Sequence, residues 1–281
     1  MDNATKLSLQ KTACKVRMGV ISGTFNAKSG HPGGSLSIAE ILTYLYFKEM
    51  NVDPQNPNKA DRDRLVLSKG HAAPGLYSVL AQRGYFDVAE LNTLRKPDSR
   101  LQGHPDMKHI PGVDMSSGSL GQGISAACGM ALSAKHFGDD FRVYTIVGDG
   151  EAEEGQVWEA AMFAAAKKLD NLVCFIDYNG LQIDGTVEEV NNPAPFEDKF
   201  KAFGWNVVTI NGHDFDQIEA ALANAKATKG VPTAIIAKTT KGKGVSYMEN
   251  QVSWHGAAPN AEQAEQAMAE LNAILTELEG K

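Results

Sequence analysis

Five short apolar runs recur along the chain, and each leads directly into a cluster of glycine and polar residues. They cover residues 65–67, 143–147, 172–176, 207–210 and 233–237. Runs this short and this continuously apolar are typical of strands that are buried on both faces of a parallel sheet. In such sheets, ligands bind beyond the carboxyl ends of the strands. The pattern therefore predicts one site, built at one edge of the sheet from loops far apart in sequence.

Helical patterns lie between and after these runs. We expect helices over residues 122–137, 155–169, 214–230 and 261–278, and capping boxes at Ser37 with Glu40 and at Asp87 with Glu90. Strand and helix alternate through the middle of the chain, and no segment resembles a linker. The sequence therefore predicts a doubly wound α/β fold, with a mainly parallel sheet flanked by helices, as one domain over residues 1–281.

Charge and composition narrow the classes of function. Lysine and arginine total 27 against 34 aspartates and glutamates, a net charge of −7, which argues against a nucleic-acid or membrane partner. No apolar run approaches the ~20 residues that span a bilayer, and the first residues show no secretory signal. The three cysteines form no CxxC pair and lie among apolar residues, so we expect buried free thiols. These features predict a soluble, cytoplasmic protein.

Asp149 and Asn179 are the first candidates for chemistry. Asp149 lies in a Gly-Asp-Gly segment directly after one predicted strand, and Asn179 follows the next strand. Gly-Asp-Gly alone is also a common turn. Because one strand–helix–strand unit returns to a neighbouring strand end, however, the two side chains are expected to face one point. Carboxylate, amide and carbonyl oxygens suit Mg²⁺ that is completed by phosphates and water.

Four of the seven histidines lie in loops rich in glycine or proline. These are His31, His71, His104 and His255. One such histidine is usually a structural hydrogen-bonding residue, whereas four in similar settings favour a shared polar pocket in which imidazoles move protons. Zinc is an alternative, but no HExxH or comparable spacing is present.

Several other residues have both an ordinary and a functional interpretation. The Gly/Ser loop 116–123 either packs tightly or brings its backbone close to a flat ligand. Glu151 and Glu154 place negative charge at a helix N-terminus, which is favourable by itself, or relay protons beside a cofactor. Arg95 and Arg100 are surface charges or anchors for phosphate.

The motifs together resemble those of a known family. Gly148-Asp149-Gly150 followed by Asp177-Tyr178-Asn179-Gly180 resembles the thiamine-diphosphate motif. The segments SGHPGG, LSKGHAAPGLY, GHPD, SSGSLGQG and WHGAAP resemble transketolase, and the resemblance extends from about residue 8 to residue 260. A full-length transketolase is considerably longer. The chain thus resembles the amino-terminal, diphosphate-binding subunit of a split transketolase.

This resemblance implies a cofactor site. The Asp149 and Asn179 side chains and the Leu181 carbonyl would hold Mg²⁺, or Ca²⁺ or Mn²⁺ in its place. The remaining residues implied to contact thiamine diphosphate are His71, Gly118, Ser119, Leu120, Gly148, Gly150, Glu151 and His255.

The resemblance also implies a substrate channel. His31, His71, His104 and His255 would line it and handle protons on the sugar hydroxyls. Arg95 aligns with a contact to the substrate phosphate. Glu154 would belong to a carboxylate network at the interface between subunits.

The implied reaction is the transfer of a two-carbon ketol unit from a ketose phosphate to an aldose phosphate. The glutamate that activates the cofactor belongs to the pyrimidine-binding domain, which would lie on a separate carboxy-terminal subunit in an α₂β₂ complex. Two alternatives stay open: a subunit of another thiamine enzyme, similar to deoxyxylulose-phosphate synthase or a 2-oxoacid dehydrogenase, and a noncatalytic regulatory or binding homologue.

Overall fold

A parallel five-stranded sheet forms the centre of the molecule. The computed structural model describes residues 1–281. In spatial order the strands are β1 (Arg64–Leu67), β2 (Val143–Gly148), β3 (Leu172–Tyr178), β7 (Thr233–Lys238) and β6 (Asn206–Asn211). All four neighbouring pairs are parallel. Each predicted run is one of these strands, which confirms the α/β prediction.

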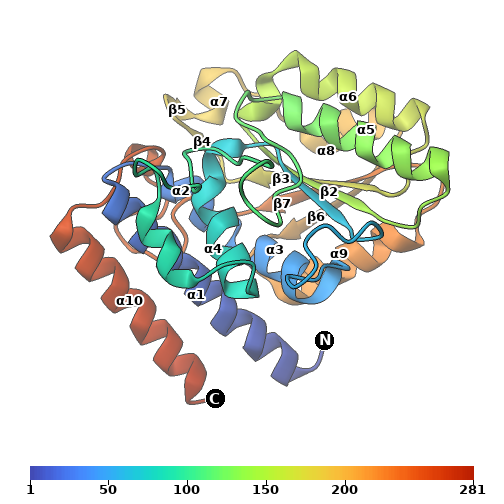
Figure 1. Ribbon diagram of the computed structural model, residues 1–281. Helices are drawn as coiled ribbons and strands as arrows, with labels where there is room; N and C mark the ends of the chain where they lie inside the picture. The colour runs from blue at the N-terminus through green and yellow to red at the C-terminus, as the bar shows by residue number, and fades with distance from the viewer.

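Helices cover both faces of the sheet (Figure 1). On one face lie α5 (Gln122–Phe137), α6 (Gly155–Ala166) and α8 (Phe196–Ala202). On the other lie α1 (Asn3–Ala27), α3 (Ala39–Tyr44), α4 (Ala73–Arg83) and α9 (Phe215–Ala227). Successive strand residues contribute to the two cores in turn: Phe175 packs with the second group of helices, and Cys174 and Ile176 with the first.

The remaining elements are short, apart from the last helix. They are α2 (Pro32–Leu36), a π-helix (Leu45–Glu49), the hairpin of β4 (Leu181–Gln182) and β5 (Gly185–Thr186), α7 (Val187–Val190), and 3₁₀ turns at Gly70–Ala72, Val88–Thr93, Glu151–Glu153 and Val252–Trp254. The last helix, α10 (Ala261–Glu279), lies along α1 (Figure 1). None of the helices is both long enough and apolar enough to pass through a membrane.

The helix predictions were mostly confirmed. α5 covers residues 122–137 as expected, and Gly138 ends it in the left-handed conformation at φ 78°. The predicted helices 155–169 and 214–230 stop earlier, at Ala166 and Ala227, and the last helix ends one residue later than predicted, at Glu279. The three cysteines are free and buried, also as expected.

The capping box at Ser37 was wrong. The Ser37 hydroxyl donates to the Gly34 carbonyl at 3.0 Å and to Asp177 at 2.7 Å, and α3 begins without a side-chain cap. Glu40 is buried against Arg17 instead of reaching back to the backbone. Buried charged partners outside the helix therefore take both side chains away from the capping role.

The second capping box was only partly right. Asp87 does cap, accepting from the Ala89 N–H at 2.8 Å, but the element that it begins is the 3₁₀ turn at Val88–Thr93. Glu90 binds Arg100 instead of the cap backbone.

Candidate active site

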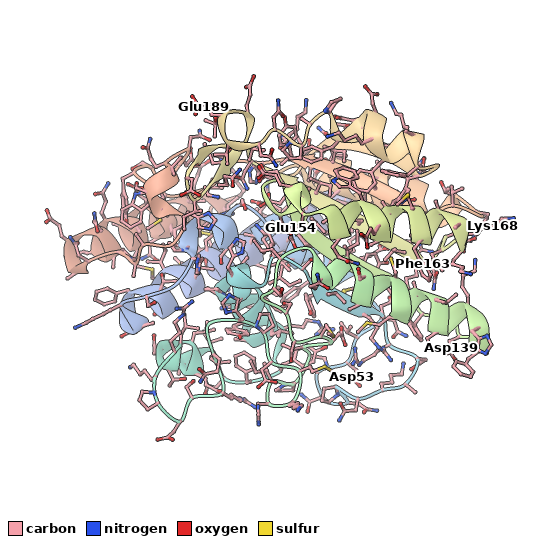
Figure 2. All side chains as sticks on the ribbon, turned by 90° about the horizontal axis from the view of Figure 1, so that it is seen from above. Asp53, Asp139, Glu154, Phe163, Lys168 and Glu189 are labelled. Atoms are coloured by element: carbon pink, nitrogen blue, oxygen red, sulfur yellow. The ribbon has the colours of Figure 1, made fainter.

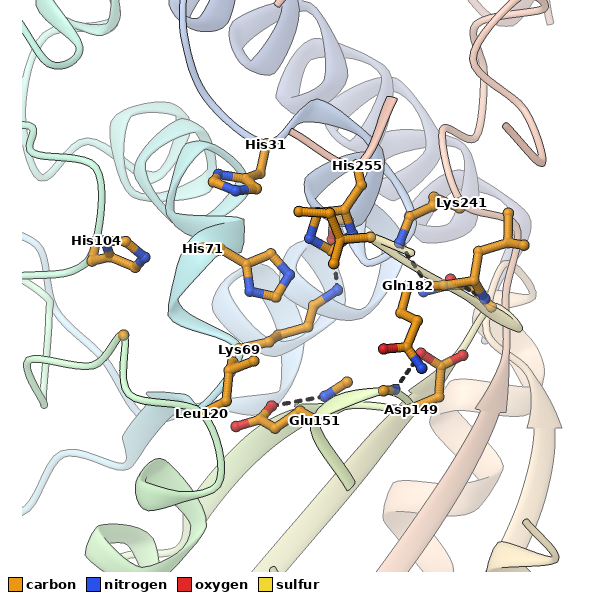
Figure 3. A pocket seen from close by; sticks show the side chains of 17 residues that line it. His31, Lys69, His71, His104, Leu120, Asp149, Glu151, Gln182, Lys241 and His255 are labelled. Atoms are coloured by element: carbon orange, nitrogen blue, oxygen red, sulfur yellow. Dashed lines mark hydrogen bonds between the residues drawn. The ribbon is translucent and has the colours of Figure 1, made fainter. Parts of the chain in front are cut away.

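A cavity of about 290 Å³ lies beyond the carboxyl ends of the strands (Figure 3). It brings together twelve of the residues singled out from the sequence: His31, His71, His104, Gly118, Leu120, Gly148, Asp149, Gly150, Glu151, Asn179, Leu181 and His255. Five further residues line it that sequence reasoning missed: Gly34, Lys69, Gln182, Ile183 and Lys241. Ser119, Glu154 and Arg95 are not among the lining residues.

The ends of β2 and β3 place Asp149 beside Asn179. Gly148 and Asp177 are register partners, so the residues that follow them emerge together. Asp149 accepts hydrogen bonds from the backbone N–H groups of Gly150 at 2.9 Å and Gly180 at 2.6 Å. The predicted convergence of these two strand ends is therefore present in the structure.

Asp177 fixes the orientation of the Asn179 amide. Its fully buried carboxylate accepts from Asn179 Nδ2 at 3.0 Å and from Lys69 Nζ at 2.5 Å, and the Thr239 hydroxyl also donates to it. Burial alone would raise the pKa of Asp177, but Lys69 and these donors hold it below its ordinary value. Because Nδ2 is committed to Asp177, Asn179 offers its oxygen to other partners.

The corner around Asp149 suits a cation. Burial, and secondly the charge of Asp177, raise the pKa of Asp149 to about 6. The Leu181 carbonyl already accepts from a cation, the Lys241 ammonium, at 2.8 Å. Burial and then Lys69 lower the pKa of Lys241 to about 8.

These residues fit a divalent ion. One carboxylate, one amide oxygen and one backbone carbonyl form a hard-oxygen set, supplied here by Asp149, Asn179 and Leu181. No group of three or more His, Cys, Asp or Glu side chains is placed to hold a metal ion. A cation in this corner would therefore depend on the amide and carbonyl oxygens as well as on Asp149.

Three imidazoles form one wall of the cavity (Figure 3). The ring centroids of His31, His71 and His255 lie 5.1–5.5 Å apart. Burial, followed by the charge of Arg95, lowers the pKa of His31 to about 4, and burial and Lys241 lower that of His255 to about 3. Burial also keeps the pKa of His71 well below its usual value. All three rings are therefore neutral near pH 7, and each can accept a hydrogen bond at one ring nitrogen and donate one from the other.

Two atoms of this cluster lack a partner within the protein. Nδ1 of His31 and Nδ1 of His255 are buried and make no hydrogen bond. Buried polar atoms are normally satisfied, so unpaired imidazole nitrogens in the cluster that lines the cavity point to a ligand or to water.

A glycine-rich loop lines the cavity beside His104. Gly118 has φ 148°, and a Cβ there would lie 3.1 Å from the His104 ring. The Ser117 hydroxyl donates to the Leu67 carbonyl at 2.7 Å, which holds the loop on the end of β1. Leu120 remains 38% exposed and lines the cavity.

Comparison with known proteins decides the family. Residues 9–273 match the family described as transketolase, thiamine diphosphate binding domain. The chain belongs to this family. It is 48% identical to the 6-deoxy-6-sulfo-D-fructose transketolase subunit SqwG of Clostridium sp. (strain MSTE9), over 95% of this chain and 97% of that protein. It is 42% identical to an apulose-4-phosphate transketolase subunit from Phocaeicola vulgatus, over 97% of this chain and 96% of that one.

Longer transketolases match only in part. Human transketolase is 44% identical over 94% of this chain, which corresponds to 42% of the human protein. The crystal structure of the Campylobacter jejuni transketolase superposes with a TM-score of 0.89 at 34% identity, covering 99% of this chain and 46% of that one. The chain therefore spans less than half of these relatives and nearly all of the two named as subunits.

Three residues predicted at the site, Arg95, Ser119 and Glu154, lie outside the cavity in this transketolase-family chain. Arg95 donates to the Ser29 hydroxyl at 3.0 Å, and its charge lowers the pKa of both His31 and His104 after burial. Ser119 and Glu154 are exposed, Glu154 at the start of α6.

Arg100, the other predicted phosphate anchor, is already paired. Its guanidinium binds the Glu90 carboxylate through two hydrogen bonds of 2.6 and 2.9 Å. The three histidines outside the cavity differ from one another: His109 and His136 are exposed, but His213, in the turn before α9, is mostly buried and contacts Glu40.

A sequence signal existed for two of the missed residues. Lys69 lies two residues after one predicted strand and Lys241 four residues after another, in the segments SKGH and TTKGKG. Lysines at these positions are expected at the same edge of the sheet as the histidines and Asp149. No comparable signal marks Gln182 or Ile183, which enter the cavity through the β4–β5 hairpin.

Proposed function

We propose that this chain is the amino-terminal subunit of a two-chain transketolase that uses thiamine diphosphate and Mg²⁺ to transfer a two-carbon ketol unit between sugar phosphates. The observation that carries the proposal is the single cavity in which Asp149, Asn179 and Leu181 face the cluster of His31, His71 and His255. One side of this cavity suits a metal-bound diphosphate, and the other suits proton transfer at hydroxyl groups.

Each side of the cavity has its own task. Asp149, Asn179 and the Leu181 carbonyl would hold Mg²⁺, and Lys69 and Lys241 add positive charge beside it. The neutral imidazoles would bind the sugar hydroxyls and move their protons. Thiamine diphosphate, when bound, supplies the carbanion chemistry that breaks and forms the carbon–carbon bonds.

The names and lengths of the relatives support a second subunit. Two relatives named as transketolase subunits are matched over 97% and 96% of their length. Ile183, at the cavity, is 61% exposed, so the cavity has an apolar rim that another chain or the cofactor would cover. We infer that the partner is a carboxy-terminal transketolase subunit, in an α₂β₂ complex.

Sugars with an anionic group are the proposed substrates. The two relatives named as subunits carry the names of a sulfonated fructose and of apulose 4-phosphate. Arg95, beside His31 and His104, is the cation that would select such a group.

The test is to isolate the native complex that contains this chain and to identify its subunits by mass spectrometry. We expect a second chain in equal amount, and ketol transfer from a ketose phosphate to an aldose phosphate by that complex. Asp149→Ala should weaken Mg²⁺-dependent binding of thiamine diphosphate by more than about tenfold, whereas Asp139→Ala, at an exposed site after α5, should not. A complex without a second chain, or one without transfer activity, would contradict the proposal.

A further inference from the structure

We propose that Glu151 is a positioning residue that fixes the Gly/Ser loop 116–121 against the strand ends, and that it does not itself bind the cofactor. The proposal rests on the proposed function, because that loop forms a wall of the candidate active site. It gives Glu151 a role different from the cofactor contact that the family resemblance implies.

Three different segments donate hydrogen bonds to the Glu151 carboxylate. The Ser68 hydroxyl, after β1, donates to Oε1 at 2.6 Å. The Gly121 N–H, at the start of α5, donates to the same oxygen at 2.9 Å. The Gly148 N–H, at the end of β2, donates to Oε2 at 2.9 Å. One carboxylate thus joins the ends of two strands to the loop that begins α5.

Both oxygens of Glu151 are committed within the protein. The residue is only 3% exposed, and hydrogen bonds from three donors to an ionised carboxylate are of the strong, charge-assisted kind. The negative charge also lies at the N-terminus of α5, where the helix dipole favours it. A carboxylate bound in this way is poorly placed to relay protons or to contact a diphosphate.

The loop has little freedom to compensate for the loss of Glu151. A Cβ at Gly123 would approach the Ser68 Cα to 2.5 Å, and one at Gly70 would approach the Gly118 nitrogen to 2.7 Å. Gly121 itself has φ 81°, a conformation that favours glycine. The backbone of the loop therefore lies directly on the end of β1, and the Glu151 carboxylate links the two.

The chemistry of the carboxylate suggests a matched substitution. Glu151→Gln keeps the size and the burial but replaces one acceptor oxygen with an NH₂ donor. Because Gly121 and Gly148 both present N–H groups, one of them must then face another donor. Glu265→Gln, on the exposed face of α10, makes the same chemical change without that conflict.

The experiment measures hydrogen exchange of segments 118–124 and 146–150 in the full chain, free and in its native complex. We expect Glu151→Gln to speed exchange at Gly121 or Gly148 by about tenfold and to weaken thiamine diphosphate binding by a similar factor, because one buried hydrogen bond is lost. At saturating cofactor, kcat and its pH profile should stay near those of the unmodified complex. Glu265→Gln should match the unmodified chain throughout.

Two results would overturn the proposal: unchanged exchange in both segments, or a lower kcat with a shifted pH profile at saturating cofactor, which would make Glu151 a direct participant in the reaction. Where Glu151→Ala fails to fold, Glu151→Gln still decides the question. Since the exchange measurement needs no turnover, it tests this proposal even if the complex proves to have no ketol-transfer activity.

Discussion

At the scale of single residues, burial determines which chemistry the imidazoles can perform. The pKa values of His31, His71 and His255 are lowered because the three rings are buried together in a cavity that also holds Lys69 and Lys241. An exposed imidazole would be partly protonated near pH 6.5. The cluster therefore presents unprotonated nitrogens to the cavity near pH 7, at the cost of stability in acid.

This cost gives a prediction about pH. The pKa of His31 falls to about 4 and that of His255 to about 3, below the ordinary 6.5. Between pH 6.5 and these lower values, the two imidazoles are protonated in the unfolded chain but stay neutral in the folded chain. The contribution of the two residues to the free energy of unfolding is therefore complete above pH 6.5, and it is lost as the pH falls toward 4 for His31 and toward 3 for His255. Denaturant unfolding of the chain at pH 7.5, 5.5 and 4.5 should show this decline.

A pair of variants separates the histidine cluster from the general effect of acid on carboxylates. His255→Gln should lose less stability between pH 7.5 and 4.5 than the unmodified chain does, because one suppressed protonation is removed. His136→Gln, at an exposed position of α5, should follow the unmodified chain. An equal decline in all three proteins would contradict the pKa argument.

At the scale of elements, a buried chain of hydrogen bonds ties the loop after β7 to the helices. The Thr240 N–H donates to His213 Nε2 at 2.9 Å, so the proton of the neutral ring lies on Nδ1, which donates to Glu40 at 2.9 Å. Glu40 in turn binds Arg17 through two short bonds of 2.6 and 2.7 Å. The network thereby links α1, α3 and the turn before α9 to the backbone beside Lys241.

Removing the central imidazole should therefore destabilise the fold. We expect His213→Ala to lower the free energy of unfolding by about 1–3 kcal/mol, because a buried carboxylate and a backbone N–H each lose a partner. His109→Ala, which breaks an exposed pair with Asp106, should cost less than about 0.5 kcal/mol. Urea unfolding of both variants is the measurement. Equal losses would mean that the network does not support the loop.

The elements also show which parts of the fold the sequence could predict. All five strands and α5 follow from local pattern, because a continuous apolar run or a small-residue helix with a terminal glycine has few other interpretations. α1 was not predicted, since its buried face, which contacts α3, α4 and α10, includes small and polar residues, among them Arg17, Gly19 and Thr24, and therefore shows no clear apolar stripe in the sequence. α10 packs on one side only, so its apolar residues at helical spacing were recognisable in the sequence.

The part of the candidate site that follows directly from the ends of the strands could be predicted from the sequence. Asp149 and Asn179 follow neighbouring strands, and the topology alone brings them together. The pairing of Arg100 with Glu90 and the burial of Glu151 depend instead on how loops fold over one another. Local sequence patterns carry no information about such contacts, so the sequence did not reveal the partners that Arg100 and Glu151 have within the protein.

At the scale of the whole molecule, the outer surface of α6 carries two large exposed apolar side chains. Met162 is 51% and Phe163 40% exposed, and α5, packed beside α6, presents the small exposed Gly129 and Ser133. Glu154 and Phe163 lie toward the two ends of α6 (Figure 2). Large apolar side chains beside small ones allow close packing of helices, and exposed apolar area of this kind marks interaction surfaces. In the proposed α₂β₂ complex, this surface would join the two copies of the present chain.

Charge introduced on this surface should separate the copies. We expect Phe163→Asp to weaken the association of two copies by at least about tenfold, because a buried unpaired carboxylate at an interface costs more than about 1.4 kcal/mol. Sedimentation of the complex over a range of concentrations measures this change. Ile274→Asp makes a similar substitution at a 41% exposed position of α10, away from α6 (Figure 1), and should leave the mass unchanged. If Phe163→Asp sediments like the unmodified complex, the two copies meet through another surface or not at all.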